Sequence, residues 1–302
     1  SGFCQTHPPA QIREDVGGFF HHHHDIVSAG IGEKMVGSDG SRWEGHRHSH
    51  GIGHAIADRR TGVGCDQLIV LERAKANGAG VFMRIRNADG GESAACGNAA
   101  RCVAALLMKE SGEDQAQIET EAGVLTAERR EDGVMLDFGP ARFEWRDIPL
   151  SEAADTLHLP LQLGPLRDPA ACSMGNPHAT FFVDDAEAVD LEALGPALEH
   201  HEMFPERANI GIAQVIGPGE IRLRVWERGA GVTRACGTGA SAAVVSGHRR
   251  GLIGREVRTI LDGGSLMIEW RQADGHVLMT GPVAVSFTAT LDPSLLSAEQ
   301  AR

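Results

Sequence analysis

Two copies of one short motif carry the clearest chemistry in this sequence. The segments ACGNAA (95–100) and ACGTGA (235–240) each place a cysteine before a glycine and a polar residue. In both copies small apolar residues follow, which predicts a buried helix that begins at the Cys-Gly pair. Because the first N–H groups of a helix are unpaired, we expect a thiol there to have a pKa lowered from about 8.5 toward neutrality. The glycine lets those N–H groups approach and bind a carboxylate.

Two such helix starts that face each other would place two thiols on opposite sides of one anionic small molecule. That arrangement suits the removal of a proton from one face of a carbon and the return of a proton to the other face. The alternative interpretation is a pair of structural cysteines in glycine-rich turns. Duplication at equivalent positions favours catalysis for Cys96 and Cys236, whereas Cys65, Cys102 and Cys172 have no counterpart and are interpreted as core residues.

The similarity between the two copies extends well beyond the cysteines. Asn87 lies nine residues before Cys96, and Glu227 lies nine residues before Cys236. The segments VMLDFGP (134–140) and VLMTGP (277–282) close the two copies. An internal repeat predicts two similar domains with pseudo-two-fold symmetry and a site in the cleft between them. We assign residues 1–140 to the first domain, completed by residues 283–302, and residues 141–282 to the second.

Hydrophobic periodicity predicts the elements that position the motifs. Apolar residues alternate with other residues over 81–86, 221–226 and 266–270, which is typical of half-buried strands. Small apolar residues without alternation predict buried helices over Ala99–Met108 and Ala240–Val245, ending near Gly112 and Gly251. An amphipathic helix is also predicted from Ala186 to about Glu199, capped by Asp184 or Asp185.

Composition excludes several classes of function. The 302 residues carry a formal net charge of −13, which disfavours nucleic-acid and anionic-membrane binding. There is no apolar run of membrane-spanning length, and no basic-then-apolar pattern opens the sequence, so we expect no signal peptide. Six scattered cysteines predict reduced thiols and a cytoplasmic location. The three lysines (Lys34, Lys75 and Lys109) lie outside every motif, so we expect no pyridoxal phosphate, no other cofactor and no metal.

Residues 1–54 form an atypical segment within the first domain. They hold nine of the fifteen histidines, including residues 21–24, and their hydrophobic periodicity is poor. A metal site, tag-like vector sequence, a disordered arm and a sequence error all remain open as interpretations. No strand or helix is predicted in this segment, and the alternation of His46, His48 and His50 is interpreted as chance.

From residue 55 to about 285 the sequence resembles the diaminopimelate epimerases, a family of cofactor-independent two-cysteine enzymes. The segments that carry the resemblance are GVGCDQLIVLE (62–72), RNADGGESAACGNAARCVA (86–104), SMGNPHATFFVDD (173–185), FPERANIGIAQV (204–215) and ERGAGVTRACGTGASAAV (227–244). The resemblance implies a fold of two α/β domains, each a curled mixed sheet around a central helix, and pairing into homodimers. It also implies that Cys96 and Cys236 are the catalytic acid and base, tuned by His178 and Glu227.

The resemblance further implies a set of residues that contact an amino-acid substrate. These are Gln67, Asn87, Gly97, Asn98, Asn176, Asn209, Glu227, Arg228, Gly237 and Thr238. Their chemistry suits the task, because a guanidinium binds a carboxylate bidentately and an amide can hold ammonium and carboxylate groups. A carboxylate or an imidazole can take a thiol proton or hold a thiolate.

One part of the family pattern is missing near the N-terminus. Asn176 precedes Asn209 by 33 residues, and 33 residues before Gln67 is position 34, where the family carries a Gly-Asn-Asp-Phe turn and strand. This chain has Lys34 there and no asparagine before Asn77. We therefore expect the first domain to lack one substrate-binding amide and its first strand.

Three functions follow as hypotheses. The leading one is epimerisation of LL-2,6-diaminopimelate to meso-diaminopimelate, in lysine and peptidoglycan-precursor synthesis. A proline racemase-like activity and a non-catalytic relative with an incomplete site are the alternatives. A nucleotide-binding oxidoreductase, suggested by GTGASA (237–242), is weakly supported because the first copy lacks that pattern.

Overall fold

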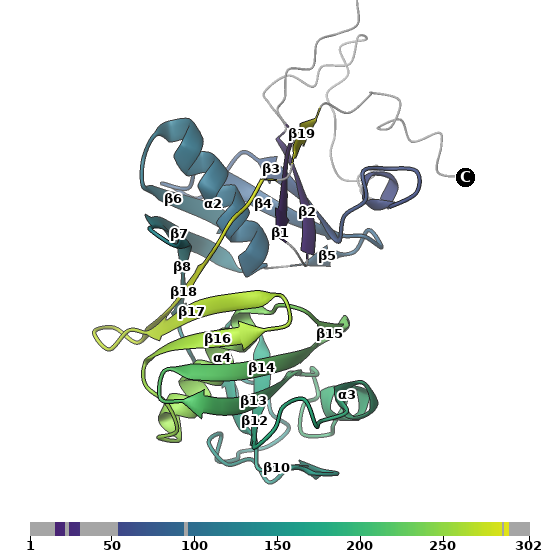
Figure 1. Ribbon diagram of the computed structural model, residues 1–302, viewed down its shortest axis with the longest axis vertical. Coiled ribbons are helices and arrows are strands. Elements are labelled where there is room, and N and C mark those ends of the chain that lie inside the picture. Colours follow the sequence, from purple (N-terminus) through teal and green to yellow (C-terminus); the bar gives the residue numbers. More distant parts are fainter. Residues whose placement is uncertain (1–15, 22–23, 31–53, 94–95, 286, 290–302) are drawn as a thin grey trace, which may run out of the picture.

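The structure is a computed structural model that describes residues 16–21, 24–30, 54–93, 96–285 and 287–289. Its strands form two halves that are joined edge to edge into one long mixed sheet (Figure 1). Helix α2 (Gly97–Ser111) packs against the sheet of the first half, and α4 (Gly237–Arg249) packs against that of the second. No helix in the described part of the chain combines the length and apolar character needed to span a bilayer.

The hydrogen-bonding order of the strands is the same in both halves. The first half runs β1 (Val16–His21), β2 (His24–Gly30), β3 (Gln67–Glu72), β4 (Val81–Asn87), β6 (Gln115–Thr120), β7 (Gly123–Arg130) and β8 (Gly133–Pro140). The second runs β11 (Ala170–Ser173), β12 (Pro177–Val183), β13 (Asn209–Gly217), β14 (Glu220–Glu227), β16 (Glu256–Leu261), β17 (Gly264–Trp270) and β18 (His276–Gly281). Parallel pairs fall at the same places, β2/β3 with β12/β13 and β4/β6 with β14/β16. The expected fold of two similar α/β units is thus confirmed.

Short strands complete the two halves. β5 (Glu92–Ser93) pairs with β4, and β15 (Gly231–Thr233) pairs with β14 in the equivalent place. β19 (Phe287–Ala289) pairs with β1, so the chain returns to the first half after β18. A small hairpin of β9 (Gln162–Leu163) and β10 (Leu166–Arg167) stands apart from the main sheet.

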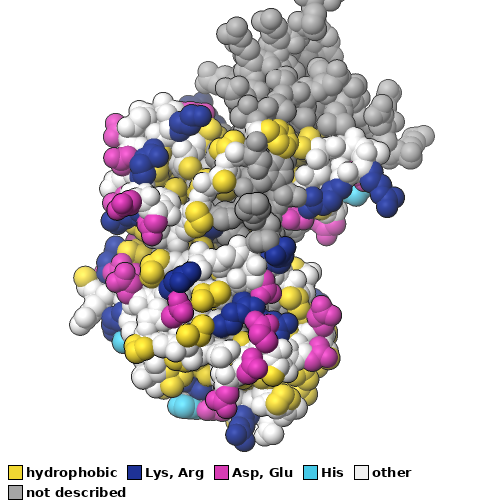
Figure 2. Space-filling view, in the orientation of Figure 1, with side chains coloured by type: hydrophobic (Ala, Val, Ile, Leu, Met, Phe, Trp, Pro, Cys, Tyr) yellow, Lys and Arg dark blue, Asp and Glu magenta, His cyan; other side chains and the backbone are white. Residues whose placement is uncertain are grey.

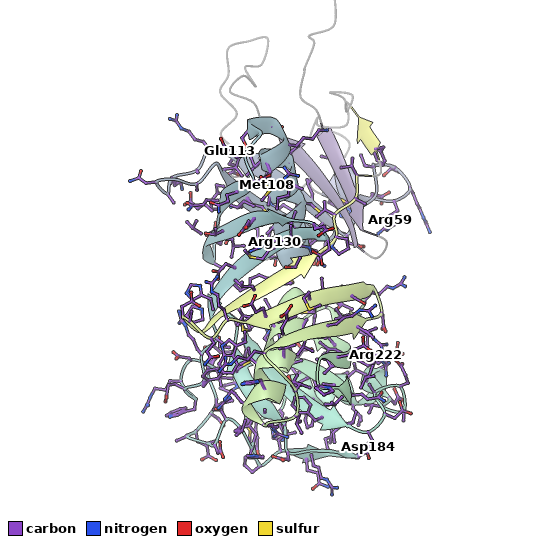
Figure 3. All side chains as sticks on the ribbon, turned by 60° about the vertical axis from the view of Figure 1, so that its left-hand side comes forward. Arg59, Met108, Glu113, Arg130, Asp184 and Arg222 are labelled. Carbon is purple, nitrogen blue, oxygen red and sulfur yellow. The ribbon has the colours of Figure 1, made fainter. Side chains whose placement is uncertain are left out.

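β8 and β18 pair antiparallel and join the two halves. Leu136 of β8 faces Met279 of β18 in this ladder, and the repeat aligns these same two residues. Equivalent residues that pair with each other mark the position of a pseudo-two-fold axis. One buried core extends across this junction and includes both central helices, while a second core lies beneath α3 (Leu191–Glu199). Met108 of α2 is fully buried in the first of these cores, whereas Arg59 and Glu113 extend from the periphery (Figure 3).

Both central helices begin at their cysteine, as the sequence predicts. Cys96 and Cys236 are the N-cap residues and have extended backbone conformations (φ −149° and −129°). Gly112 ends α2 with φ 76°, a left-handed conformation that glycine adopts without steric cost. The periodicity of 221–226 is confirmed, because Ile221, Leu223 and Val225 are buried and alternate with less buried residues. In β4, by contrast, Phe82 and Arg86 are buried as well, so that strand is covered on both faces.

Three predictions about local structure are wrong. Helix α3 begins at Leu191, because the side chain of Asp190, and not that of Asp184 or Asp185, accepts a hydrogen bond from the Ala193 N–H (3.1 Å). Residues 1–54 contain two strands, β1 and β2, so the first half retains the strand that was expected to be lost. These strands escaped prediction because glycines and histidines interrupt any apolar alternation.

The missing amide is also at a different position from the one expected. Gln67 and Asn209 are equivalent in the repeat. Ile26 pairs with Gln67 and His178 pairs with Asn209, so Ile26 is the equivalent of His178. The residue two positions earlier, His24, is therefore the equivalent of Asn176 in place of position 34. The rest of the histidine-rich segment up to residue 53 lies outside the described residues. His54 begins a short helical turn and contacts the Ala88 carbonyl through Nδ1 (3.0 Å).

Candidate active site

The two thiols occupy equivalent places but differ in burial and in bonding. Cys236 is 6% exposed, and its Sγ accepts a hydrogen bond from the Gly239 N–H (3.4 Å) and lies 3.6 Å from the Thr238 hydroxyl. Cys96 is half-buried and forms no capping hydrogen bond of regular geometry, although the Ala99 and Asn98 N–H groups still act on its thiol. The same backbone position therefore supports two different thiol environments.

Both thiol pKa values are raised, which contradicts the expectation of lowered values. Burial is the main cause for each thiol, and the negative charge of Glu227 adds to it. The N–H groups at the helix starts act in the expected direction, since those of Ala99 and Gly239 lower the pKa of the neighbouring thiol. Desolvation of the thiolate outweighs this effect, because a buried charge loses more hydration than a few N–H groups restore.

The two helix starts meet at β8 and β18. A Cβ atom added to Gly97 would lie 2.9 Å from Met279 Cε and 2.8 Å from Phe138 Cζ, and one added to Gly237 would lie 2.6 Å from Met279 Sδ. Met279 is fully buried and thus lies between the two glycines that follow the cysteines. With glycine at both positions the two helix starts approach Met279 closely, and a larger residue at either position would require the Met279 side chain to move.

On the second half, four side chains form a connected series that ends at Cys236. His178 Nε2 lies 2.9 Å from Asn176 Oδ1, and Asn176 Nδ2 donates to the Thr238 hydroxyl (3.5 Å), which is next to the Cys236 sulfur. His178 is 2% exposed, and burial, together with the charge of Arg228, lowers the pKa of its imidazole to about 3. The imidazole is therefore neutral at physiological pH. In the tautomer that carries its proton on Nε2, this nitrogen donates a hydrogen bond to the Asn176 oxygen.

Glu227 and Arg228 follow each other at the end of β14. Glu227 accepts a hydrogen bond from the Thr233 hydroxyl, and its charge reaches both thiols. The Arg228 N–H donates to Asn209 Oδ1 (2.9 Å), and Arg228 Nη1 donates to the Glu206 carbonyl (3.0 Å). Asn209 in turn donates to the Pro177 carbonyl (2.9 Å), which connects β13 to the loop that carries Asn176.

On the first half, the corresponding residues form smaller groups. Gln67 Nε2 donates to Asn87 Oδ1 (3.0 Å), and these two residues are paired across β3 and β4. Asn98 is buried and accepts a hydrogen bond from Arg101 Nη2 (2.9 Å). The structure thus links Asn176, His178 and Thr238 to Cys236, whereas Gln67 and Asn87 contact each other and Asn98 contacts Arg101. The negative charge of Glu227 raises the pKa of both thiols.

Three residues of this region were not predicted from the sequence. They are Thr233, Arg101 and Met279. The repeat contained a signal for Met279, because it closes the second copy where Leu136 closes the first. No such signal existed for Arg101, whose repeat equivalent is Ser241, or for Thr233, which contacts Glu227 only because β15 folds back onto β14.

A metal or a Schiff-base cofactor would need its own set of side chains. Within those ranges, no cluster of three or more His, Cys, Asp or Glu side chains has the geometry to hold a metal ion. Lys75 and Lys109 are both exposed. The histidine run at 21–24, one of the candidate metal sites, has no described side chains.

Comparison with known proteins identifies the family. A sequence profile described as diaminopimelate epimerase matches residues 43–144 and 170–286. The diaminopimelate epimerase of Rhodospirillum centenum is 59% identical over 243 residues, which are 80% of this chain and 83% of that protein. The chain belongs to the diaminopimelate epimerase family. The enzyme of that name from Acidiphilium cryptum is 58% identical over 243 residues, with 80% and 87% of the two chains covered.

Solved structures extend the likeness of fold beyond this family. A hydroxyproline epimerase from Agrobacterium vitis, solved with bound trans-4-hydroxy-L-proline, matches with a TM-score of 0.62 at 18% identity and covers 93% of each chain. At this identity the match shows a shared fold and carries no evidence on substrate. It therefore does not favour the proline alternative over the diaminopimelate epimerase family.

Proposed function

We propose that this protein epimerises LL-2,6-diaminopimelate to meso-diaminopimelate by proton transfer between Cys96 and Cys236. One observation carries the proposal: the two Cys-Gly helix starts meet on either side of Met279. The identity of more than half to relatives named diaminopimelate epimerase supports the choice of substrate. An isomerase of this family belongs to lysine biosynthesis.

The reaction needs one thiolate and one thiol. The thiolate takes the α-proton from one face of the substrate carbon, and the thiol gives its proton to the opposite face of the resulting carbanion. The first cysteine is then protonated and the second is a thiolate, so the number of protons is unchanged and the enzyme is ready for the reverse direction. Because a second negative charge near Glu227 is unfavourable, the carboxylate helps to keep one of the two thiols protonated.

The remaining residues are proposed to bind the substrate. The N–H groups after Gly97 and Gly237 suit its carboxylates, and Arg228 suits a carboxylate as a bidentate partner. The amide and hydroxyl groups proposed to complete the contacts belong to Gln67, Asn87, Asn98, Asn176, Asn209 and Thr238. His178, neutral and buried, is proposed to orient Asn176 and through it the Thr238 hydroxyl beside Cys236.

Several wider properties are proposed with this function. The domain boundaries are residues 1–140 with 283–302, and 141–282, which the pairing of β19 with β1 supports. We propose a cytoplasmic homodimer that uses no cofactor or metal, since its chemistry needs two reduced thiols and Lys75 and Lys109 are exposed. The net charge of −13 supports a small-molecule partner over nucleic acid or membrane. The face shown in Figure 2 supports this too, because Lys and Arg side chains there are interspersed with Asp and Glu.

The experiment that tests the function is isotope exchange. Purified protein is incubated with LL-diaminopimelate in heavy water, and deuterium at the α-carbon is measured by mass spectrometry alongside formation of the meso isomer. L-proline serves as the matched control substrate. Exchange with LL-diaminopimelate alone supports the proposal, exchange with proline alone supports a proline racemase, and no exchange with either supports a non-catalytic relative.

A further inference from the structure

We propose that Glu199, the last residue of α3, is a positioning residue that holds Glu227 and Arg228 in place. This proposal rests on the function proposed above, because it assigns a role toward the same site. Glu199 lies outside both Cys-Gly motifs and outside the predicted set of site residues. The argument depends on what its carboxylate contacts.

The two carboxylate oxygens of Glu199 accept hydrogen bonds from the residues that flank Glu227 and Arg228 in the sequence. Oε2 accepts a hydrogen bond from Trp226 Nε1 (2.7 Å), and Oε1 accepts one from the Gly229 N–H (3.0 Å). Trp226 comes directly before Glu227, and Gly229 comes directly after Arg228. One buried carboxylate, 3% exposed, therefore holds both ends of the two-residue segment that carries the charged groups.

The segment needs such support because it lies in a tight turn. Gly229 and Gly231 both have left-handed backbone conformations (φ 77° and 84°), and the Ala230 N–H donates to the Glu227 carbonyl (3.0 Å). Glycine adopts these left-handed conformations at no steric cost but leaves the turn more conformational freedom than other residues do. Side-chain hydrogen bonds from outside the turn therefore add to its internal bond in holding one conformation.

Glu199 and Asn209 divide this task between them. Asn209 Oδ1 accepts from the Arg228 N–H (2.9 Å), and Glu199 accepts from the next N–H along the chain. Two successive backbone donors are therefore held by side-chain oxygens from two different elements, α3 and β13. The indole ring of Trp226 also packs closely against the same helix, since a Cβ added to Gly195 of α3 would lie 2.4 Å from it.

The location of Glu199 is unfavourable apart from this role. A carboxylate at the C-terminus of a helix opposes the helix dipole, and burial of a charge requires compensation. Arg207 approaches only to 3.7 Å, and its side chain is 53% exposed, so this ion pair compensates little. The hydrogen bonds from Trp226 and Gly229 supply the main compensation, because bonds to a charged acceptor are the strong ones.

The test is Glu199→Gln, with Glu72→Gln as the matched control. Glutamine keeps the shape of glutamate but has one oxygen, so its NH₂ group must face either the indole N–H or the Gly229 N–H. Glu72 also accepts two hydrogen bonds, both from Arg84, but it lies on β3 away from the turn. Two quantities are measured: the pH midpoint for alkylation of Cys236 by iodoacetamide, and kcat and KM for LL-diaminopimelate.

The expected result is a shift of the Cys236 midpoint to lower pH, because Glu227 raises the pKa of that thiol and a displaced Glu227 raises it less. We expect a midpoint shift of about one unit, a tenfold change in thiolate fraction at fixed pH, together with a fall in kcat/KM. Glu72→Gln is expected to change neither quantity. Because Glu199 acts through Glu227, its replacement is expected to add nothing further to the midpoint shift in a Glu227→Gln background.

Two outcomes would overturn the proposal: an unchanged Cys236 midpoint in Glu199→Gln, or a shift of equal size in the Glu227→Gln background. If Glu199→Gln does not fold, Trp226→Phe removes only the indole donor, keeps an aromatic ring beside Gly195, and is expected to give a smaller shift of the same sign. Alkylation needs no turnover. A protein that fails to epimerise diaminopimelate but shows the coupled shift would therefore disprove the function while it supports the role of Glu199.

Discussion

The two halves of this molecule share a backbone plan but differ in the side chains around their thiols. In the second half, Cys236 is buried and contacts the Gly239 N–H and the Thr238 hydroxyl, with His178 and Asn176 behind them. In the first half, Cys96 is more exposed and has no side-chain capping bond. Arg101, a buried cation, lies on its helix where the second half has Ser241.

The difference teaches that a repeated fold can place two groups symmetrically and still make them chemically unequal. Backbone equivalence brings both thiols to the N-termini of helices. The pKa of each thiol then depends on burial and on neighbouring charges, and these come from side chains that the two copies do not share. The proposed two-thiol mechanism suits this difference, because at any moment it needs one cysteine as a base and the other as an acid.

The largest effect is expected from removal of either thiol. Cys96→Ser or Cys236→Ser should lower epimerisation by about 10²–10⁴-fold, because each replaces a proposed catalytic acid or base with a much weaker acid. Loss of halide from a β-halogenated substrate analogue needs only one deprotonation, so each variant should retain elimination with one stereoisomer. Halide release is the measurement. The two variants should prefer opposite stereoisomers, and a shared preference would show that the thiols do not lie on opposite faces of the substrate.

The next largest effect concerns His178, whose first-half equivalent is Ile26. Burial lowers the pKa of His178 from 6.5 to about 3, so between these values the unfolded chain binds a proton that the folded protein does not bind. The free energy of unfolding should therefore fall as the pH is lowered through this range, by up to about 1.4 kcal/mol per pH unit. Urea denaturation at several pH values measures it. His178→Gln should show a shallower dependence, and an unchanged slope would contradict the assigned cause.

A smaller effect should separate the thiols directly. The Thr238 hydroxyl beside Cys236 lowers the pKa of that thiol. Thr238→Val removes this hydroxyl and should therefore raise the pKa of Cys236 while it leaves Cys96 untouched. Loss of one such contact, about 1 kcal/mol, should slow alkylation of Cys236 roughly fivefold at neutral pH. Quantification of the two cysteine peptides by mass spectrometry gives both rates in one sample. Equal slowing of Cys96 would argue against independent environments.

The smallest effect is expected from restoring symmetry on the first half. His24 occupies the register position equivalent to Asn176, so His24→Asn would return an amide to the place where the second half has one. We expect KM for LL-diaminopimelate to fall roughly twofold, as for one weak hydrogen bond of about 0.5 kcal/mol. Steady-state kinetics of His24→Asn and His24→Ala test this. If both variants have the same KM, the amide at position 24 does not contact the substrate.

Local features of the sequence were enough to predict much of the fold. The two Cys-Gly helix starts, the alternation in β14 and the repeat of the structural unit were all predicted correctly, because each can be read from short segments or from the comparison of two such segments. Prediction failed where a local signal was ambiguous or hidden. Three aspartates preceded α3, and only Asp190 proved to be the cap, while histidines and glycines concealed β1 and β2.

The sequence by itself determined that this chain carries one structural unit twice, with a cysteine at the start of the central helix in each copy, because repetition and helix capping are properties of consecutive residues. Only the tertiary structure decided how the thiols differ. Burial and the charge of Glu227 raise both pKa values against the effect of the helix N-termini. The roles of Glu199 and Met279 likewise depend on contacts between elements far apart in the chain. Desolvation and long-range contact exist only once the chain has folded, and no local pattern encodes them.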